Sequence, residues 1–168
     1  FWMVEPEMAF CDLDGDMDIL LTNGDAWDNT YVMPSHGVQW LENLGNFDFA
    51  HHRLADMPGA YRALAGDLDL DGDMDVIAVA WLPPAVMPLS VRSGPLVSII
   101  CLEQTQPGVF ARHTLETGSP LYATLEMADF DNDGDLDFAV GPGPHVANMQ
   151  NLSHWLSVWW NQKLQPKE

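Results

Sequence analysis

The sequence predicts an all-β fold, built from a unit of about 60 residues that occurs almost three times. The motif Asp-Gly-Asp-x-Asp begins at Asp14, Asp71 and Asp133. Between these motifs the apolar runs are short and are separated by turn residues, and no stretch keeps a helical period of 3.6. Short strands at a regular spacing are typical of all-β repeat folds.

The second unit shows the four expected strands most clearly. They are "RALAGD" (62–67), "DVIAVAW" (75–81), "LVSIICLE" (96–103) and "VFARHTL" (109–115). Four antiparallel strands in each unit, at this period, are the layout of a β-propeller blade. We therefore predict one segment, 1–168, with repeat units of approximately 8–62, 63–124 and 125–168, the last of them incomplete.

Similar segments align the units outside the acidic motif. "FAHHRL" (49–54) matches "FARHTL" (110–115), and "VQWLEN" (38–43) aligns with "SIICLE" (98–103) and more loosely with "SVWWNQ" (157–162). Closed propellers typically have four to eight blades, so about three blades would leave strand edges and apolar faces open. The chain is therefore expected to be part of a larger propeller, completed by other blades or protein chains.

The charge of the chain excludes some partners. The 168 residues include 25 acidic and 6 basic ones, for a net charge of −19, while 47% are apolar. Nucleic acids and anionic lipids require clustered Lys and Arg, so nucleic-acid binding is not expected. The apolar content is too high for a disordered acidic chain, and no run is long enough to predict membrane insertion.

Acidic residues concentrate in three loops, which are candidate metal sites. The second and third units carry the pattern D-x-D-x-D-G-D-x-D at 67–75 and 129–137. Carboxylates at alternating positions of a tight loop can converge on one ion, and Gly72 and Gly134 permit the turn that closes the loop. A donor set made only of oxygen favours a hard cation, Ca²⁺ before Mg²⁺.

Two alternatives to this kind of metal loop are an EF-hand and a simple polar turn. An EF-hand loop begins in the same way but requires a Glu at position 12 between flanking helices, and here that position is Ala78 or Val140 in a strand-like run. The alternative is a polar turn whose Asp side chains only satisfy local backbone amides. Three such loops at the period of the repeat favour metal binding over simple turns.

The motif D-x-D-x-D-G-x-x-D followed by a strand, together with "VQWLEN…F…H", resembles the FG-GAP/VCBS repeats of calcium-binding β-propellers, such as integrin α-subunit heads and secreted bacterial proteins. The resemblance covers nearly the whole chain. It implies two calcium sites in which the aspartates ligate through side chains, except for a carbonyl donor at the seventh position. These residues are Asp67, Asp69, Asp71, Asp73 (carbonyl) and Asp75, and Asp129, Asp131, Asp133, Asp135 (carbonyl) and Asp137.

The first unit departs from the motif, because it has "FCDLDGDMD" at 10–18. Either Phe10 takes the place of the first Asp, or two residues are deleted and Asp12 takes the first position. In both cases Asp12, Asp14 and Asp18 are the expected side-chain ligands, with Asp16 as a carbonyl donor.

The long loops between the second and third strands are the candidate ligand face. They cover about 22–37, 82–96 and 141–155, at the end of the blades opposite the Asp loops, and long loops on a rigid scaffold often carry binding residues. The candidates are Trp27, Tyr31, His36, Arg92, His145 and His154. The alternative is that these loops only cover the ends of the blades.

The remaining motifs give no catalytic assignment. His52 and His113 occupy equivalent places in successive units, so we predict structural roles for both. Trp40, Trp159 and Trp160 recur in one strand and are predicted to belong to the core between blades. The chain has no nucleophile elbow, P-loop or dinucleotide motif, and its histidines have no zinc spacing. Cys11 and Cys101 can form a disulfide if the protein is secreted, and the alternative is two buried free thiols.

Taken together, the sequence predicts a calcium-binding, extracellular or periplasmic propeller module that acts as a binding or adhesion scaffold. Two alternatives stay open: a self-assembling structural subunit, and a carbohydrate-binding or polysaccharide-lyase-type domain that binds glycans. An enzyme is the less favoured interpretation.

Overall fold

The structure is a computed structural model that describes residues 4–9, 15–24, 26, 30–83, 85–118, 120–143 and 155–163, and the side chains of 4–9 and 92 are outside this description. The described residues form eleven strands and one short helix, α1 (Leu89–Arg92). The prediction of an all-β fold is therefore confirmed. A four-residue helix is far too short to cross a bilayer, so no described helix could span a membrane.

The strands form three antiparallel sheets, each from consecutive segments of the chain. The first sheet contains β1 (Val4–Ala9), β2 (Asp18–Thr22), β3 (Gly37–Asn43) and β4 (Phe49–Asp56). The second contains β5 (Ala60–Gly66), β6 (Asp75–Ala80), β7 (Val97–Gln106) and β8 (Val109–Thr117). The third contains β9 (Tyr122–Ala128), β10 (Asp137–Pro142) and β11 (Ser157–Trp159).

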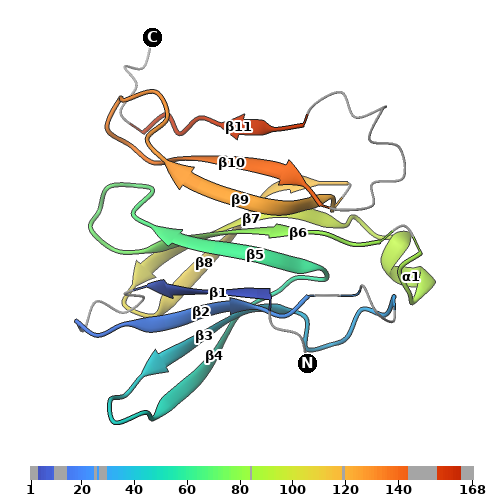
Figure 1. Ribbon diagram of the computed structural model, residues 1–168, viewed down its shortest axis with the longest axis horizontal. Helices are drawn as coiled ribbons and strands as arrows, with labels where there is room; N and C mark the ends of the chain where they lie inside the picture. Colours follow the sequence, from blue (N-terminus) through green and yellow to red (C-terminus); the bar gives the residue numbers. More distant parts are fainter. Residues whose placement is uncertain are drawn as a thin grey trace.

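The three sheets lie one above another, with the second sheet in the middle (Figure 1). The Asp loops 67–74 and 129–136 join β5 to β6 and β9 to β10, and both lie at one end of the stack (Figure 1). Helix α1 belongs to the connection between β6 and β7 and lies at the opposite end. The predicted strands of the second unit are β5 to β8, and in this unit the acidic loop and the long loop lie at opposite ends, as predicted.

Apolar side chains fill both spaces between the sheets. The first core joins the first sheet, through residues such as Leu20 and Val38, to the second sheet, through Val76 and Ile100. The second core joins the other face of the second sheet to the third sheet. Every residue of β6 is buried, because both of its faces are covered. This explains why "DVIAVA" is apolar without alternation.

The register of the third strands corrects the sequence alignment by one residue. Trp40 pairs with His52, and Cys101 pairs with His113, so these residues occupy equivalent places, 61 residues apart rather than 60. Trp159 pairs with Phe138 and corresponds to Leu102, not to Trp40. The prediction that Trp160 belongs to the core was wrong, since its exposed fraction is 52%. A shift of one residue in a strand moves a side chain to the other face.

Candidate metal centres

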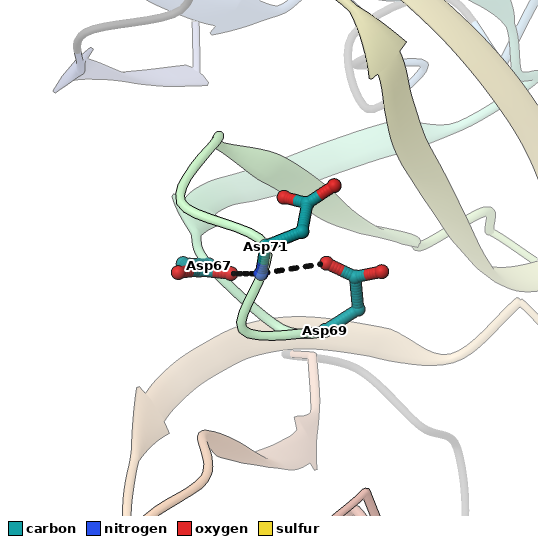
Figure 2. Close-up of side chains that lie close together, drawn as sticks. All are labelled: Asp67, Asp69 and Asp71. Atoms are coloured by element: carbon teal, nitrogen blue, oxygen red, sulfur yellow. Dashed lines mark hydrogen bonds between the residues drawn. The ribbon is translucent and has the colours of Figure 1, made fainter.

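The loop 67–75 is shaped by its own carboxylates (Figure 2). Asp67 accepts hydrogen bonds from the backbone N–H groups of Asp71 and Gly72, both at 3.1 Å, and Asp69 accepts a longer one from the Asp71 N–H at 3.3 Å. Leu70 and Gly72 have φ angles of 64° and 96°, which turn the backbone sharply. The loop therefore needs both the aspartates and the glycine to keep this conformation.

The loop 129–137 repeats the same hydrogen bonds. Asp129 accepts from the backbone N–H groups of Asp133 and Gly134 at 3.2 and 3.1 Å, and Asp131 accepts from the Asp133 N–H at 3.2 Å. Asn132 and Gly134 have φ angles of 62° and 99°. The two loops thus share one backbone skeleton, although they belong to different sheets.

Carboxylate oxygens converge in both loops. One oxygen from each of Asp67, Asp69 and Asp71 lies within 4.8 Å of the other two, and the same holds for Asp129, Asp131 and Asp137. A hard cation such as Ca²⁺ or Mg²⁺ prefers oxygen ligands of this kind. The donor sets therefore fit a divalent cation. The two groups differ in their third member, which is Asp71 at the fifth position of one loop and Asp137 at the ninth position of the other.

Repulsion between carboxylates also affects the Asp73 side chain. Burial, followed by the negative charges of Asp71 and Asp75, raises the pKa of Asp73 to about 6. Its Oδ1 is buried and has no hydrogen-bond donor within the described residues. Negative charge in this loop is therefore poorly compensated by the protein itself.

The last aspartate of each loop connects it to the third strand of its own sheet. Asp75 Oδ1 accepts from the Gln104 N–H at 2.9 Å, and Asp137 Oδ1 accepts from the Asn161 N–H at 2.8 Å. Asp18 Oδ1 accepts from the Asn43 N–H at 2.8 Å in the first sheet. All three aspartates are buried. In all three sheets, therefore, an aspartate at the start of the second strand accepts the same kind of backbone hydrogen bond.

The second oxygens of two of these aspartates are also hydrogen-bonded. Asp75 Oδ2 accepts from the Leu68 N–H and Asp137 Oδ2 accepts from the Phe130 N–H, each at 3.1 Å. Burial raises the pKa of Asp75, while the hydrogen bonds from the N–H groups of Gln104 and Leu68 act in the opposite direction. Both carboxylates close their loops through hydrogen bonds from the backbone.

The sequence did not indicate the residues that donate hydrogen bonds to the three buried aspartates. The side-chain amides of Asn43, Gln104 and Asn161 each donate to the carbonyl that precedes the buried aspartate, at 3.2 to 3.3 Å. Asn161 also donates to the Leu68 carbonyl at 2.6 Å, which ties the third sheet to the loop of the second. A recurring Asn or Gln at the end of each third strand was the available signal, and the misaligned register concealed it.

The other predicted residues lie in different places. Asp12, Asp14, Cys11, Trp27, His145 and His154 lie outside the described residues, as does the Arg92 side chain. Asp16 follows Gly15, whose φ is 101°. Tyr31 is 52% exposed on a loop that contacts the next long loop through the Val32 N–H and the Met87 carbonyl, at 2.8 Å. His36 is buried, and its carbonyl accepts a hydrogen bond from Arg53.

The equivalent histidines form equivalent side-chain contacts with a glutamate. His52 lies 2.6 Å from Glu42 and stacks on the Trp40 indole, with ring centroids 4.4 Å apart. His113 lies 2.7 Å from Glu103. Cys101, at the place of Trp40, is a free thiol, and burial, together with the charges of nearby acidic residues, raises its pKa to about 12. A thiol of this kind is a poor nucleophile.

Comparisons with known proteins assign no family. No protein-family model matches the chain. A stretch of 19 residues, 11% of this chain, is 90% identical to part of the asparagine–tRNA ligase of Nostoc sp. and 84% identical to part of the same enzyme from Microcystis aeruginosa. The match spans 4% of the length of these curated relatives. A likeness of this extent carries no argument about fold or activity.

Proposed function

We propose that the chain is a three-blade segment of a calcium-stabilised β-propeller of the FG-GAP/VCBS type, which acts outside the cytoplasm as a binding or adhesion scaffold. The observation that carries this proposal is the repetition of one Asp-loop skeleton in two sheets, with convergent carboxylates in each. Three stacked antiparallel sheets from consecutive segments are compatible with neighbouring blades.

The residues that would hold calcium are those whose oxygens converge. In the second sheet they are Asp67, Asp69 and Asp71, and in the third they are Asp129, Asp131 and Asp137. A bound Ca²⁺ would supply positive charge to a group of carboxylates that the protein leaves poorly compensated. The chain itself supplies the loop shape, through the N–H groups of Asp71 and Gly72 and their equivalents. This role is structural, and calcium at extracellular concentrations suits modules of moderate affinity.

Calcium would stabilise more than one sheet. The loop 67–75 is joined to the third sheet by the hydrogen bond from Asn161 to the Leu68 carbonyl, so its order affects the packing of two sheets. A site filled at about 100 times its dissociation constant adds about 2.7 kcal/mol to the free energy of unfolding. For a domain of this size, that corresponds to an increase in Tm of about 5 to 10 °C.

The experiment combines calcium content with thermal stability. The purified chain is dialysed against 1 mM Ca²⁺ or against excess chelator, its metal is measured by elemental analysis, and its Tm by circular dichroism. The test variant combines Asp69→Asn and Asp71→Asn, which leaves Asp67 to hold the loop, and the control is Asp48→Asn at an exposed turn. We expect the double variant to lose one bound calcium and part of the calcium-dependent rise in Tm.

Two outcomes decide the proposal. If the wild-type chain binds no calcium and its Tm is the same in both buffers, the calcium-stabilised propeller is refuted and the loops are solvated turns. If calcium binds but the double variant retains the full number of ions, the sites lie elsewhere. The molecular mass, measured by light scattering in both buffers, shows whether calcium also controls the association of chains.

A further inference from the structure

One residue, Asn161, donates hydrogen bonds to two Asp loops. These are the second-sheet loop (67–75) and the third-sheet loop (129–137), which lie at the same end of the stack (Figure 1). The side-chain amide of Asn161 donates to the Leu68 carbonyl of the second-sheet loop at 2.6 Å and to the Leu136 carbonyl of the third-sheet loop at 3.2 Å. An amide NH₂ group has two donor hydrogens, so each loop receives one of them.

The backbone of Asn161 is held by a residue of the proposed third-sheet site. Its N–H donates to Asp137 Oδ1 at 2.8 Å, and its Oδ1 accepts from the Lys163 N–H at 3.2 Å. Asp137 is one of the three residues whose oxygens converge in the third-sheet loop. A carboxylate oxygen has more than one lone pair, so it can accept an N–H and contact a cation together. The place of Asn161 is therefore set by a proposed calcium ligand.

The other end of this link holds the second-sheet loop between two of its proposed ligands. Leu68 lies between Asp67 and Asp69, whose oxygens converge with a third carboxylate. The Leu68 N–H donates to Asp75 Oδ2 at 3.1 Å, and its carbonyl accepts from Asn161. This carbonyl belongs to the planar peptide unit that leads into Asp69. The hydrogen bond from Asn161 therefore restricts the orientation of the Asp69 backbone.

The Leu136 side chain gives the two loops a second contact. Leu136 directly precedes Asp137, and Gly66 directly precedes Asp67. A Cβ atom on Gly66 would lie 2.9 Å from Leu136 Cδ1, so this side chain lies directly against the backbone of the second sheet. Both contacts thus involve residues next to proposed ligands, and a change in the order of one loop affects the other.

An ion pair between the same segments has the wrong sign to explain such a link. Lys163 Nζ lies 3.6 Å from Asp69 Oδ2, and the lysine side chain is 50% exposed. Exposed ion pairs contribute little and are screened by salt. The positive charge of the lysine also opposes a cation in this loop. The link between the loops therefore depends on Asn161.

We propose that Asn161 couples the two sites, so that calcium bound in one loop raises the calcium affinity of the other. The inference rests on the proposed function, because it concerns the regulation of the same two sites. Asp137, once it ligates an ion, is restrained and fixes Asn161, whose amide then holds the Leu68 carbonyl. The second-sheet loop loses less conformational freedom when it binds its own ion. Linkage requires the same coupling factor in both directions.

The first sheet supplies a matched control for Asn161. Asn43 has the equivalent place there, since its N–H donates to Asp18 Oδ1 at 2.8 Å. Its side-chain amide donates to the Met17 carbonyl at 3.2 Å, as that of Asn161 does to the Leu136 carbonyl. Asn43→Ala therefore removes an equivalent amide from a sheet that the proposed link does not include.

Hydrogen exchange measured by mass spectrometry can follow calcium binding at each loop separately. Peptides that cover 64–78 and 126–142 are followed through a calcium titration of the 168-residue protein. The third-sheet site is emptied by combining Asp131→Asn and Asp133→Asn, which leaves Asp137 to hold Asn161. We expect the calcium midpoint of the second-sheet loop to be about fivefold higher in this variant than in the wild-type chain.

The same comparison is then made in two backgrounds. In Asn161→Ala we expect the emptied third-sheet loop to leave the midpoint of the second-sheet loop unchanged. In Asn43→Ala we expect the full difference to remain. Circular dichroism verifies that each variant folds. The comparison with the wild-type background needs no change at Asn161, so it tests the coupling even if Asn161→Ala does not fold.

The reverse experiment tests reciprocity. Asp69→Asn combined with Asp71→Asn empties the second-sheet loop, and we expect the midpoint of the third-sheet loop to rise by the same factor. The coupling is overturned if emptying either loop leaves the other midpoint unchanged, or if the difference persists in Asn161→Ala. In those cases calcium still protects the loops and the proposed function stands. If calcium protects neither loop of the wild-type chain, the proposed function is refuted and the coupling with it.

Discussion

Replacing Asp75 with Asn tests whether the buried carboxylate holds the second sheet together. Asp75 is 2% exposed, and its two oxygens accept hydrogen bonds from the N–H groups of Gln104 and Leu68. An Asn side chain can accept only one of these bonds, and its NH₂ group then faces the other N–H. A buried donor without an acceptor costs about 1–3 kcal/mol. The remaining bond is no longer charge-assisted, which costs about 1 kcal/mol more.

Relief of the buried charge acts in the opposite direction, because burial raises the pKa of Asp75. We therefore expect a net loss of about 2 kcal/mol in the free energy of unfolding, or about 4 to 8 °C in Tm. Urea unfolding, followed by circular dichroism in chelator, measures the loss without a contribution from calcium. The control is Asp48→Asn, which removes the same charge from an exposed turn. Equal stability of the two variants would refute this account of the buried aspartate.

Two further predictions concern the loop charges and the contact between the first two sheets. The pKa of Asp73 is raised to about 6 in the folded chain, so the folded chain takes up a proton at a higher pH than the unfolded chain does. In the absence of calcium, the free energy of unfolding therefore increases as the pH falls through 6 and decreases as the pH rises. The Tm in chelator should therefore be higher at pH 5 than at pH 7.5, with a smaller difference in 1 mM Ca²⁺, and a Tm that rises with pH in chelator would contradict this. A Cβ on Gly24 would lie 2.0 Å from the backbone nitrogen of Ala60, so we expect Gly24→Ala to cost about 3 kcal/mol in urea unfolding. Gly94→Ala, whose Cβ meets nothing closer than 3.8 Å, is its control, and equal midpoints would show that the contact is not rigid.

Most of the strand pattern could be predicted from the sequence, because local chemistry determines it. The runs "DVIAVAW" and "LVSIICLE" are too short for helices and are bounded by turn residues, and both became strands, β6 and β7. The register of the third strands was missed, although the sequence carries a signal for it: aligning "VQWLEN" one residue later matches Leu41 and Glu42 to Leu102 and Glu103. The contacts from Asp18, Asp75 and Asp137 agree with this shifted register.

The acidic positions of the candidate site could likewise be predicted. Which of these carboxylates converge and which bind the backbone could not. Alternating aspartates and a glycine indicate a tight loop with convergent carboxylates, and Asp67, Asp69 and Asp71 do converge. Whether a given carboxylate faces a cation or the backbone depends on neighbours that are distant in sequence. The Gln104 N–H, which donates to Asp75, lies 29 residues away in the sequence, and the Asn161 side chain donates to the Leu68 carbonyl across 93 residues. No local pattern contains those partners.

The spaces between the sheets show why a repeat in sequence does not imply a repeat in side-chain packing. Trp40 fills the first space from the side of the first sheet, and the small Ala65 lies against it in the second. In the second space the small and large side chains come from the opposite sheets. The small Cys101 of the second sheet takes the place of Trp40, and the large residues Met127 and Trp159 come from the third sheet. Much of the volume is thus supplied from the opposite side. The strand skeleton is repeated in the units of this chain, whereas the packing between the sheets follows from the size of single side chains.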